Sequence, residues 1–196
     1  DILGGIVGLV LTGVLTIFVA PLIMIESPGP IFFSQIRIGK NGRRFKIYKF
    51  RSVYMDAEER KKELMEQNKM SGLMFKMDDD PRITKVGKFI RKTSIDELPQ
   101  FWNILKGDMS VVGPRPERAV FVEQFEKEIE NYEYRFEVKA GLTSLSHVYG
   151  RYSTYIHDRT YYDLFYITHY SLLLDLKIIL LTTKTMFLKS AAEGED

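Results

Sequence analysis

Residues 2–25 read ILGGIVGLVLTGVLTIFVAPLIMI and contain no charged side chain. As an α-helix, this stretch would be long enough to cross a hydrocarbon core about 30 Å thick. No basic segment precedes it and no clean cleavage site follows it, which argues against a removed signal peptide. The apolar character stops at the residues ESPGP, Glu26–Pro30. The sequence therefore predicts a membrane anchor over residues 1–30 and a second domain over residues 31–196.

Two arrangements of the anchor remain open from the residues alone. Its length favours a helix that spans the membrane. A helix that enters and leaves on one face is favoured by the residues that weaken helices, which are Gly4, Gly5, Gly8, Gly13 and Pro21. A break inside lipid would need protein or water to satisfy the freed backbone groups. On these grounds the spanning helix is the default expectation.

A basic block follows the anchor. Residues 37–51 include no acid and seven cations, Arg37, Lys40, Arg43, Arg44, Lys46, Lys49 and Arg51. Such a block can meet anionic lipid, substrate phosphates or nucleic acid, or can form a solvated surface. Its place next to an apolar segment favours the cytoplasmic face of a membrane.

Composition excludes several kinds of site. The 196 residues suit one compact domain with an appendage. There is no cysteine, so disulfides and thiolate zinc sites are excluded. The three histidines, His147, His157 and His169, do not have the spacing of a metal-ligand motif.

The remaining pattern predicts a mainly helical α+β fold. Residues 31–35 and 37–48 are expected to form a small β-hairpin, because Asn41-Gly42 is a favoured turn pair. Helices are expected over 56–69, 86–91, 94–106 and 117–135, with a strand-like run at 109–116 and a loop around Gly141. Residues 158–189 combine aromatic and leucine-rich runs, which are typical of an interfacial amphipathic helix and equally of a soluble core.

Adjacent carboxylates mark the candidate catalytic segment. Residues 91–100 read RKTSIDELPQ and place Asp96 and Glu97 beside cations at a predicted helix start, where phosphate is attracted. An ionised Asp can bind a divalent metal or attack phosphorus. The alternative is structural, because Ser94 and Glu97 have the spacing of a capping box.

A second candidate is the turn Gly113-Pro114-Arg115-Pro116. Two prolines stiffen the turn and lower the entropy that Arg115 loses when it grips a phosphate. A plain loop explains the same residues.

These segments together resemble a known family. SIDELPQFWNILKGDMSVVGPRP (94–116), KFRS (49–52) and DPRIT (80–84) are similar to the bacterial sugar transferases, which are monotopic polyprenyl-phosphate phosphoglycosyl transferases. SPGP (27–30), Phe33, Gln35, Arg37 and Gly39 fit the same family. The resemblance implies a re-entrant helix-break-helix anchor, catalytic helices, and amphipathic C-terminal helices in the interface of the bacterial inner membrane. The active site would lie on the cytoplasmic face.

The resemblance also implies a two-step, Mg²⁺-dependent reaction that initiates surface polysaccharide synthesis. Asp96 would attack the β-phosphorus of a UDP-sugar and release UMP, and polyprenyl (undecaprenyl) phosphate would then take the phosphosugar. The expected partners are these two substrates and membrane lipids, with no nucleic acid. Asp96 would be the nucleophile and a metal ligand, and Glu97 its partner or a base. Arg91 would bind a phosphate, and Arg115, between Pro114 and Pro116, would bind the nucleotide. Lys49 and Arg51 are weaker candidates for contacts with substrate phosphates.

The sequence departs from the family pattern in two places. The Ser-Pro pair that breaks the anchor in small members is replaced by Thr12-Gly13-Val14, so a break is expected at Gly13 or Pro21. A Pro-Gly-Ile-Thr-Gly-like loop reads AGLTS (140–144), with His147 where Gln is usual. Larger members carry further membrane helices before this domain, so a longer and homo-oligomeric parent is expected. The sequence does not identify the sugar. As an alternative mechanism, polyprenyl phosphate attacks the UDP-sugar directly in a ternary complex. The alternative function is a catalytically silent membrane scaffold of a polysaccharide assembly.

Overall fold

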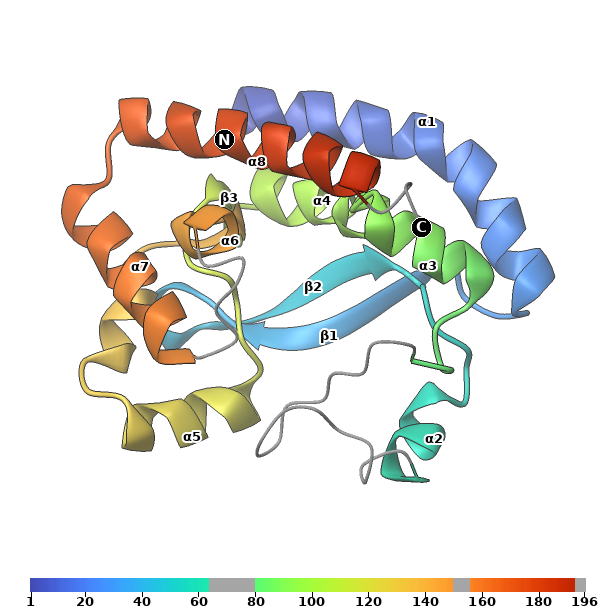
Figure 1. Ribbon diagram of the computed structural model, residues 1–196, viewed down its shortest axis with the longest axis horizontal. Helices are drawn as coiled ribbons and strands as arrows, with labels where there is room; N and C mark the ends of the chain where they lie inside the picture. The colour runs from blue at the N-terminus through green and yellow to red at the C-terminus, as the bar shows by residue number, and fades with distance from the viewer. Residues whose placement is uncertain (64–79, 150–155, 193–196) are drawn as a thin grey trace.

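A computed structural model describes residues 1–63, 80–149 and 156–192, with side chains for 1–60, 80–149 and 156–185. The described chain is mainly helical with two small sheets, which confirms the α+β prediction (Figure 1). In order, the elements are α1 (Ile2–Glu26), β1 (Phe32–Ile38), η1 (Lys40–Gly42), β2 (Arg44–Phe50), α2 (Ala57–Glu63), α3 (Lys85–Lys92), η3 (Ile95–Glu97), α4 (Gln100–Leu105), β3 (Met109–Val112), α5 (Ala119–Glu128), η4 (Tyr132–Phe136), β4 (Ala140–Thr143), α6 (Leu145–Tyr149), α7 (Ile156–His169) and α8 (Leu172–Ala192).

The predicted hairpin is confirmed. Strands β1 and β2 pair antiparallel, and the last pair is Ile38 opposite Arg44. The turn needs left-handed backbone, which Asn41 (φ 56°) and Gly42 (φ 71°) supply. The hairpin places Lys49 near the end of β2, beside the carboxylate pair.

The predicted loop around Gly141 is wrong, because β4 pairs parallel with β3. The two backbones approach closely: a Cβ on Gly141 would lie 2.1 Å from the amide nitrogen of Gly113. The Gly113 N–H donates to the carbonyl of Thr143 at 3.0 Å. Only glycine fits at this crossing, and it fixes the start of the Gly113–Pro116 turn.

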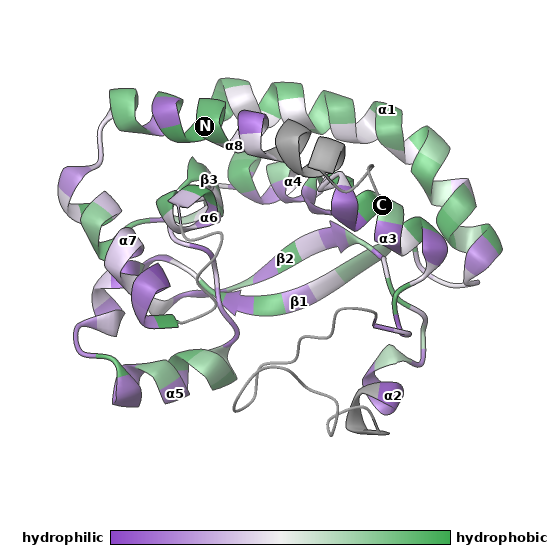
Figure 2. Ribbon diagram, in the orientation of Figure 1, coloured by the Kyte–Doolittle hydropathy of each residue, from purple (hydrophilic) through white to green (hydrophobic). Residues whose placement is uncertain are grey.

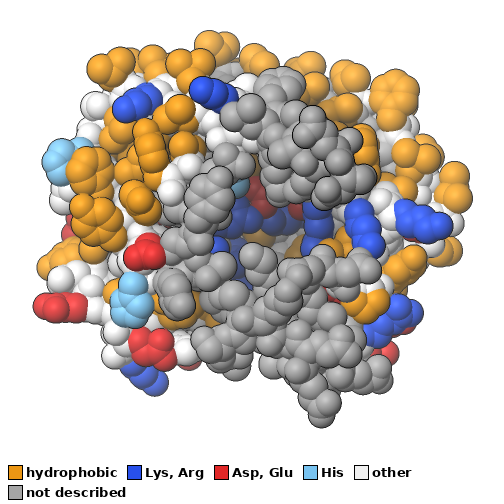
Figure 3. Space-filling model, viewed as in Figure 1, with side chains coloured by type: hydrophobic (Ala, Val, Ile, Leu, Met, Phe, Trp, Pro, Cys, Tyr) orange, Lys and Arg blue, Asp and Glu red, His pale blue; other side chains and the backbone are white. Residues whose placement is uncertain are grey.

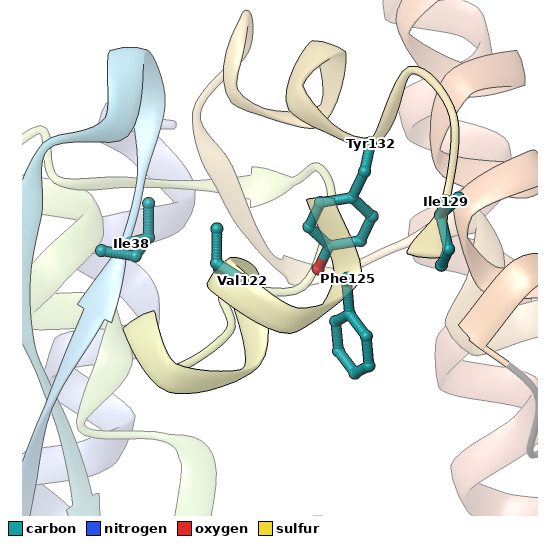
Figure 4. Close-up of a cluster of buried hydrophobic side chains, with 5 residues drawn as sticks. All are labelled: Ile38, Val122, Phe125, Ile129 and Tyr132. Atoms are coloured by element: carbon teal, nitrogen blue, oxygen red, sulfur yellow. The ribbon is translucent and has the colours of Figure 1, made fainter. Parts of the chain in front are cut away.

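Two predicted helices are interrupted. The segment 94–106 turns left-handed at Ser94 (φ 58°), forms the short turn η3, and becomes α-helical only from Gln100. The segment 117–135 is α5 followed by η4, which begins after left-handed Asn131 (φ 63°). This second interruption lets Tyr132 fold back against Phe125, with ring centroids 5.6 Å apart. The core cluster that results is shown in Figure 4 and comprises Ile38, Val122, Phe125, Ile129 and Tyr132.

The other helix predictions hold where they can be compared. Residues 86–91 lie in α3. The predicted helix over 56–69 is confirmed as α2 for its described part, and residues 64–69 lie outside the described residues. The C-terminal stretch forms two helices, α7 and α8, that are separated at Tyr170-Ser171.

Helix α1 packs along the domain through its small residues. A Cβ on Gly5 would lie 2.6 Å from the Leu105 side chain, and a Cβ on Gly8 would lie 2.3 Å from the ring of Phe101. One turn later, the Thr12 hydroxyl lies 3.1 Å from the carbonyl oxygen of Leu98. The glycines that weaken this helix in isolation therefore let its backbone approach α4 closely. Figure 1 shows α1 curving over α4 and α3.

Both ends of α1 are fastened to the domain by carboxylates. Asp1 Oδ1 accepts hydrogen bonds from Ser110 Oγ (2.8 Å) and the Val111 amide (2.9 Å). At the other end, Glu26 accepts from the amides of Lys85 (2.6 Å) and Val86 (2.8 Å) and so caps α3.

The helix-break-helix form of the anchor is not confirmed. Residues 2–26 form one α-helix that contains Pro21 and runs through Gly13. By length and hydropathy it is the one helix in the described residues that could cross a membrane. At about 1.5 Å per residue its 25 residues extend about 37 Å.

The docking of α1 predicts different outcomes for two alanine substitutions in the same helix. Gly8→Ala should lower the free energy of unfolding by about 1–3 kcal/mol, because its methyl group meets the ring of Phe101. Gly13→Ala has open space at its Cβ, so it should raise stability by up to about 1 kcal/mol through helix propensity. Thermal unfolding of both variants in detergent measures the difference. Equal effects would mean that α1 does not dock on α4 in this way.

Candidate active site

Four parts of the chain bring their charged side chains together. Lys49 comes from β2, Arg91 from the last turn of α3, Asp96 and Glu97 from η3, and Arg115 from the turn after β3. Figure 3 shows basic and acidic side chains gathered in a hollow near the middle of one face, over the region between α3 and β2. A buried cluster supports these elements and comprises Phe45, Ile47, Ile104, Met109 and Ala140.

Glu97 is held by two cations. Its Oε1 lies 2.6 Å from Lys49 Nζ and 2.6 Å from Arg115 Nη2, and its Oε2 lies 3.3 Å from Arg115 Nη1. Burial alone would raise the pKa of Glu97, but the charges and hydrogen bonds of Arg115 and Lys49 outweigh it and hold that pKa far below its usual range. The capping-box interpretation is wrong, because Ser94 is left-handed and its side chain makes no cap hydrogen bond.

Asp96 is in the opposite situation. It is 8% exposed, and within the described part of the chain its carboxylate makes no hydrogen bond or ion pair. Burial, followed by the charge of Glu97, raises the pKa of Asp96, while Lys49, Arg91 and Arg115 partly offset this effect. Asp96 lies in the short turn η3 rather than at the start of a long helix, so side-chain cations take the place of the helix dipole that the sequence suggested.

Arg91 is a further cation whose charge acts on Asp96, and it precedes Asp96 in the chain whereas Arg115 follows it. Its Nε donates to Ser52 Oγ at 2.7 Å, which orients the guanidinium. The nearby ion pair between Asp80 and Arg82, 2.6 Å from Oδ2 to Nη2, adds to the charges around Arg91. The sequence alone assigned no role to Ser52. Its position directly after the basic block 37–51 was the feature that could have indicated one.

Arg51 lies apart from the other predicted site residues. It is buried and donates to both the hydroxyl and the carbonyl of Ser27. The structure thus uses Arg51 to join the end of β2 to the end of α1. Pro114 and Pro116 are buried on either side of Arg115, as a rigid turn requires.

The site offers few protein ligands for a metal. Among the described residues there is no group of three or more His, Asp or Glu side chains that could hold an ion. Within the cluster itself, Glu97 is occupied by cations and Asp96 is not.

A comparison with protein-family models decides the family. The model of the bacterial sugar transferases matches residues 1–189. The chain belongs to the bacterial sugar transferase family.

Curated relatives of this bacterial sugar transferase agree with that membership. It is 50% identical over 194 residues to the galactosyl transferase CpsE of Streptococcus agalactiae, covering 98% of this chain and 42% of the relative. It is 43% identical over 189 residues to the UDP-N-acetylgalactosamine-undecaprenyl-phosphate N-acetylgalactosaminephosphotransferase of Aeromonas hydrophila, covering 95% and 42%. It is 40% identical over 197 residues to the UDP-glucose:undecaprenyl-phosphate glucose-1-phosphate transferase of Klebsiella pneumoniae, covering 98% and 40%. The chain therefore spans about two fifths of the length of these relatives.

Replacing the two adjacent carboxylates should change stability in opposite directions. Asp96→Asn should raise the melting temperature near neutral pH by about 2–4 °C, because it removes a buried charge that has no direct partner among residues 1–60, 80–149 and 156–185. Glu97→Gln should lower the melting temperature, because Lys49 and Arg115 lose their shared counter-charge. Thermal unfolding in detergent measures both changes.

The pH dependence of these changes follows from the two pKa directions. Because the pKa of Glu97 is lowered, its stabilisation is complete above the ordinary value of 4.5 and is lost as the pH falls below it. Because the pKa of Asp96 is raised, its penalty is present at neutral pH and disappears as the pH falls to the ordinary value of 3.8. A Glu97→Gln difference that stays constant down to acidic pH would contradict the ion-pair geometry.

Proposed function

We propose that this bacterial sugar transferase transfers a sugar 1-phosphate from a UDP-sugar to undecaprenyl phosphate and releases UMP. The observation that carries the proposal is the environment of Asp96. Among the described residues this buried carboxylate has no direct partner, and the charges of Lys49, Arg91 and Arg115 act on it. Relatives whose names state this type of transfer support the proposal. Those names differ in the sugar, so the proposal covers UDP-hexoses and their N-acetylated forms as a class.

The reaction proceeds by two displacements at one phosphorus atom. An oxygen of Asp96 attacks the β-phosphorus of the UDP-sugar, and the bond from that phosphorus to the bridging oxygen breaks, so that UMP leaves with the oxygen. A phosphate oxygen of undecaprenyl phosphate then attacks the same phosphorus. The bond to Asp96 breaks, the carboxylate is restored, and the product is undecaprenyl diphosphate sugar. Asp96 can make the first attack because no side chain in the described part of the chain binds its carboxylate.

The cations around Asp96 stabilise the transferring phosphoryl group. Arg115 and Lys49 present their charges beside Asp96, because Glu97 holds both of them there. Arg91 contributes a third cation that Ser52 orients. Transfer of a phosphoryl group depends mainly on such positioning and charge neutralisation. The strongly lowered pKa of Glu97 makes it a weak base in this arrangement, so we assign it the role of holding Arg115 and Lys49.

The site suits Mg²⁺ with one protein ligand. Mg²⁺ commonly binds one or two carboxylates and completes its shell with substrate phosphates and water. Asp96 is the carboxylate of this cluster that no cation occupies, so it would hold the ion together with the diphosphate of the donor. When bound, Mg²⁺ would neutralise charge on the phosphates.

We further propose that the protein lies on the cytoplasmic face of the bacterial inner membrane and dips α1 into one leaflet. A helix upright across the bilayer would carry α3 and α4 into lipid, because α1 contacts both of them and is fastened at both ends. Figure 2 shows apolar residues of α1 and α8 along one edge of the molecule. In the proposed arrangement this edge faces the membrane, so that the enzyme reaches both the lipid and the soluble substrate. Exposed apolar side chains on these helices include Ile2, Leu3, Ile6, Val7, Val10, Ile17, Phe18, Ile25, Leu172, Leu173, Leu176 and Leu180.

The two-step reaction is tested by exposing the purified protein to UDP-glucose, UDP-galactose and their N-acetylated forms, with Mg²⁺ and undecaprenyl phosphate. Wild-type protein should release UMP with at least one donor and lose this activity when Mg²⁺ is chelated. Without the lipid acceptor, mass spectrometry should find a phosphosugar on Asp96. Asp96→Asn should show neither adduct nor turnover, while remaining folded. Turnover without an adduct would instead favour direct transfer in a ternary complex, and a folded protein silent with every donor would contradict the proposed function.

The membrane arrangement is tested with single cysteines, since the chain has none of its own. Cysteines replace exposed Asp1, the polar residue before α1, and exposed Asn41 in the hairpin turn of the domain. In membrane vesicles that expose the cytoplasmic face, both should react with a maleimide that does not cross the bilayer. Labelling of Asn41→Cys alone, with Asp1→Cys labelled only after detergent is added, would show that α1 spans the membrane.

A further inference from the structure

The turn that carries Arg115 cannot fix itself with its own amides. Pro114 and Pro116 have no N–H group, so two of three consecutive residues cannot donate a backbone hydrogen bond. The prolines restrict φ, but they do not attach the turn to the rest of the domain. Its position must therefore be set by donors that reach its carbonyl oxygens from elsewhere.

Four consecutive carbonyls of this turn are each held by a different donor. The Gly141 amide in β4 donates to Pro114 at 2.9 Å, and the Ile38 amide in β1 donates to Glu117 at 2.9 Å. Between them, Arg135 Nη2 donates to the carbonyl of Arg115 at 3.1 Å, and Arg37 Nη1 donates to that of Pro116 at 3.2 Å. Two arginine side chains thus do what backbone amides do on either side.

Hydrogen bonds from all three nitrogens hold the guanidinium of Arg135 in place. It is 4% exposed, and its Nε and Nη2 lie 2.8 and 2.7 Å from Oδ2 of Asp163, which is 1% exposed. Its Nη1 donates to the hydroxyl of Tyr132 at 2.5 Å. Ser146 Oγ donates to the other oxygen of Asp163 at 3.0 Å. Elements η4, α6 and α7 therefore converge on one guanidinium whose remaining bond goes to Arg115.

Stability alone is a weak reason for this arrangement. A buried ion pair costs several kcal/mol in desolvation per ion, and apolar replacements are often equally stable. What the charged pair adds is direction, because a planar guanidinium has several donors at fixed angles. Here one of those donors points at the backbone of the residue whose side chain holds Glu97.

Resting on the proposed function, we propose that Arg135, oriented by Asp163, is a positioning residue for the phosphoryl-transfer site. It acts through Arg115: it holds the Arg115 carbonyl and thereby sets where the guanidinium of Arg115 meets Glu97 and the donor diphosphate. Arg37 supports the following carbonyl in the same way, compensated by Glu117 at 3.7 Å.

A double-mutant cycle on turnover of the UDP-sugar separates positioning from general structural support. Arg135→Lys keeps the charge for Asp163 but lacks the planar fork that also reaches Arg115. It should lower kcat/KM for the donor by about 10- to 100-fold, through a higher KM, a lower kcat or both, because small misplacements at a reacting centre cost this much. In an Arg115→Lys background, the same substitution should cause less than a 3-fold further loss, because the residue through which it acts is already impaired.

The matched control is Thr160→Val, which removes a buried hydroxyl on the same helix as Asp163. That hydroxyl donates to the carbonyl of Ile156 in the same helix at 2.9 Å. The control should leave kcat/KM for the donor unchanged. If Arg135→Lys does not fold, Ser146→Ala provides a milder change in the same direction, because it frees one oxygen of Asp163. Equal losses from Arg135→Lys in the wild-type and Arg115→Lys backgrounds would overturn the proposal.

Hydrogen exchange gives a readout that does not depend on turnover. The amides of Gly113, Gly141 and Ile38 donate hydrogen bonds at this turn. They should exchange at least 10-fold faster in Arg135→Lys than in wild type, and at the wild-type rate in Thr160→Val. Unchanged exchange in Arg135→Lys would overturn the positioning role. A wild-type protein that is silent with every donor, yet shows the predicted exchange, would overturn the proposed function and leave the hold on the turn standing.

Discussion

The site is organised by the sharing of Glu97 between Lys49 and Arg115. Cations that lie close together repel one another and need an internal counter-charge. Glu97 supplies it at 2.6 Å from each cation. The charges of the same two cations also lower the pKa of the neighbouring Asp96, and so offset part of the effect of its burial. The two adjacent carboxylates therefore differ because of their neighbours rather than their residue types. Glu97 is paired with two cations, and Asp96 has no direct partner among the described residues.

The anchor and the site share structural elements. Glu26 caps the first turn of α3, and Arg91 stands in the last turn of the same helix. Ser27 binds Arg51, and the next residue, Ser52, orients Arg91. Packing of Ile23 with Phe50 and Ile90 completes the connection. Helix α1 and one cation of the site, Arg91, are therefore connected by a continuous set of packed and hydrogen-bonded side chains.

Local chemistry made part of the structure predictable. The hairpin depends on Asn41 and Gly42, which supply the required backbone angles whatever surrounds them. The resemblance placed Asp96, Glu97, Arg91 and Arg115 in one site, and the structure brings these four together with Lys49. The pairing of Lys49 with Glu97 could not be read from the chain, because the two residues are 48 positions apart.

Other features depend on tertiary contacts that leave little local signal. The apolar periodicity of residues 117–135 continues across the interruption at Asn131, so one helix and two look alike. Strand β4 has four residues and exists only because β3 lies beside it. The glycines of α1 suggested a weak helix, whereas Gly5 and Gly8 form a surface against which Leu105 and Phe101 pack. The buried pair of Arg135 and Asp163 leaves only a weak sequence signal: each lies three residues from a tyrosine, Tyr132 or Tyr166, and so shares a helical face with it.

The attachment of α1 at both ends has a consequence for the order of events during synthesis. Asp1 binds Val111, 110 positions later, and Thr12 binds Leu98, 86 positions later. Chains emerge from the ribosome N-terminal end first, at about 5–20 residues per second. The apolar helix is therefore exposed for several seconds before its protein partner exists. In the membrane arrangement proposed above, lipid receives the helix first, and the domain then folds onto a helix that is already in the bilayer.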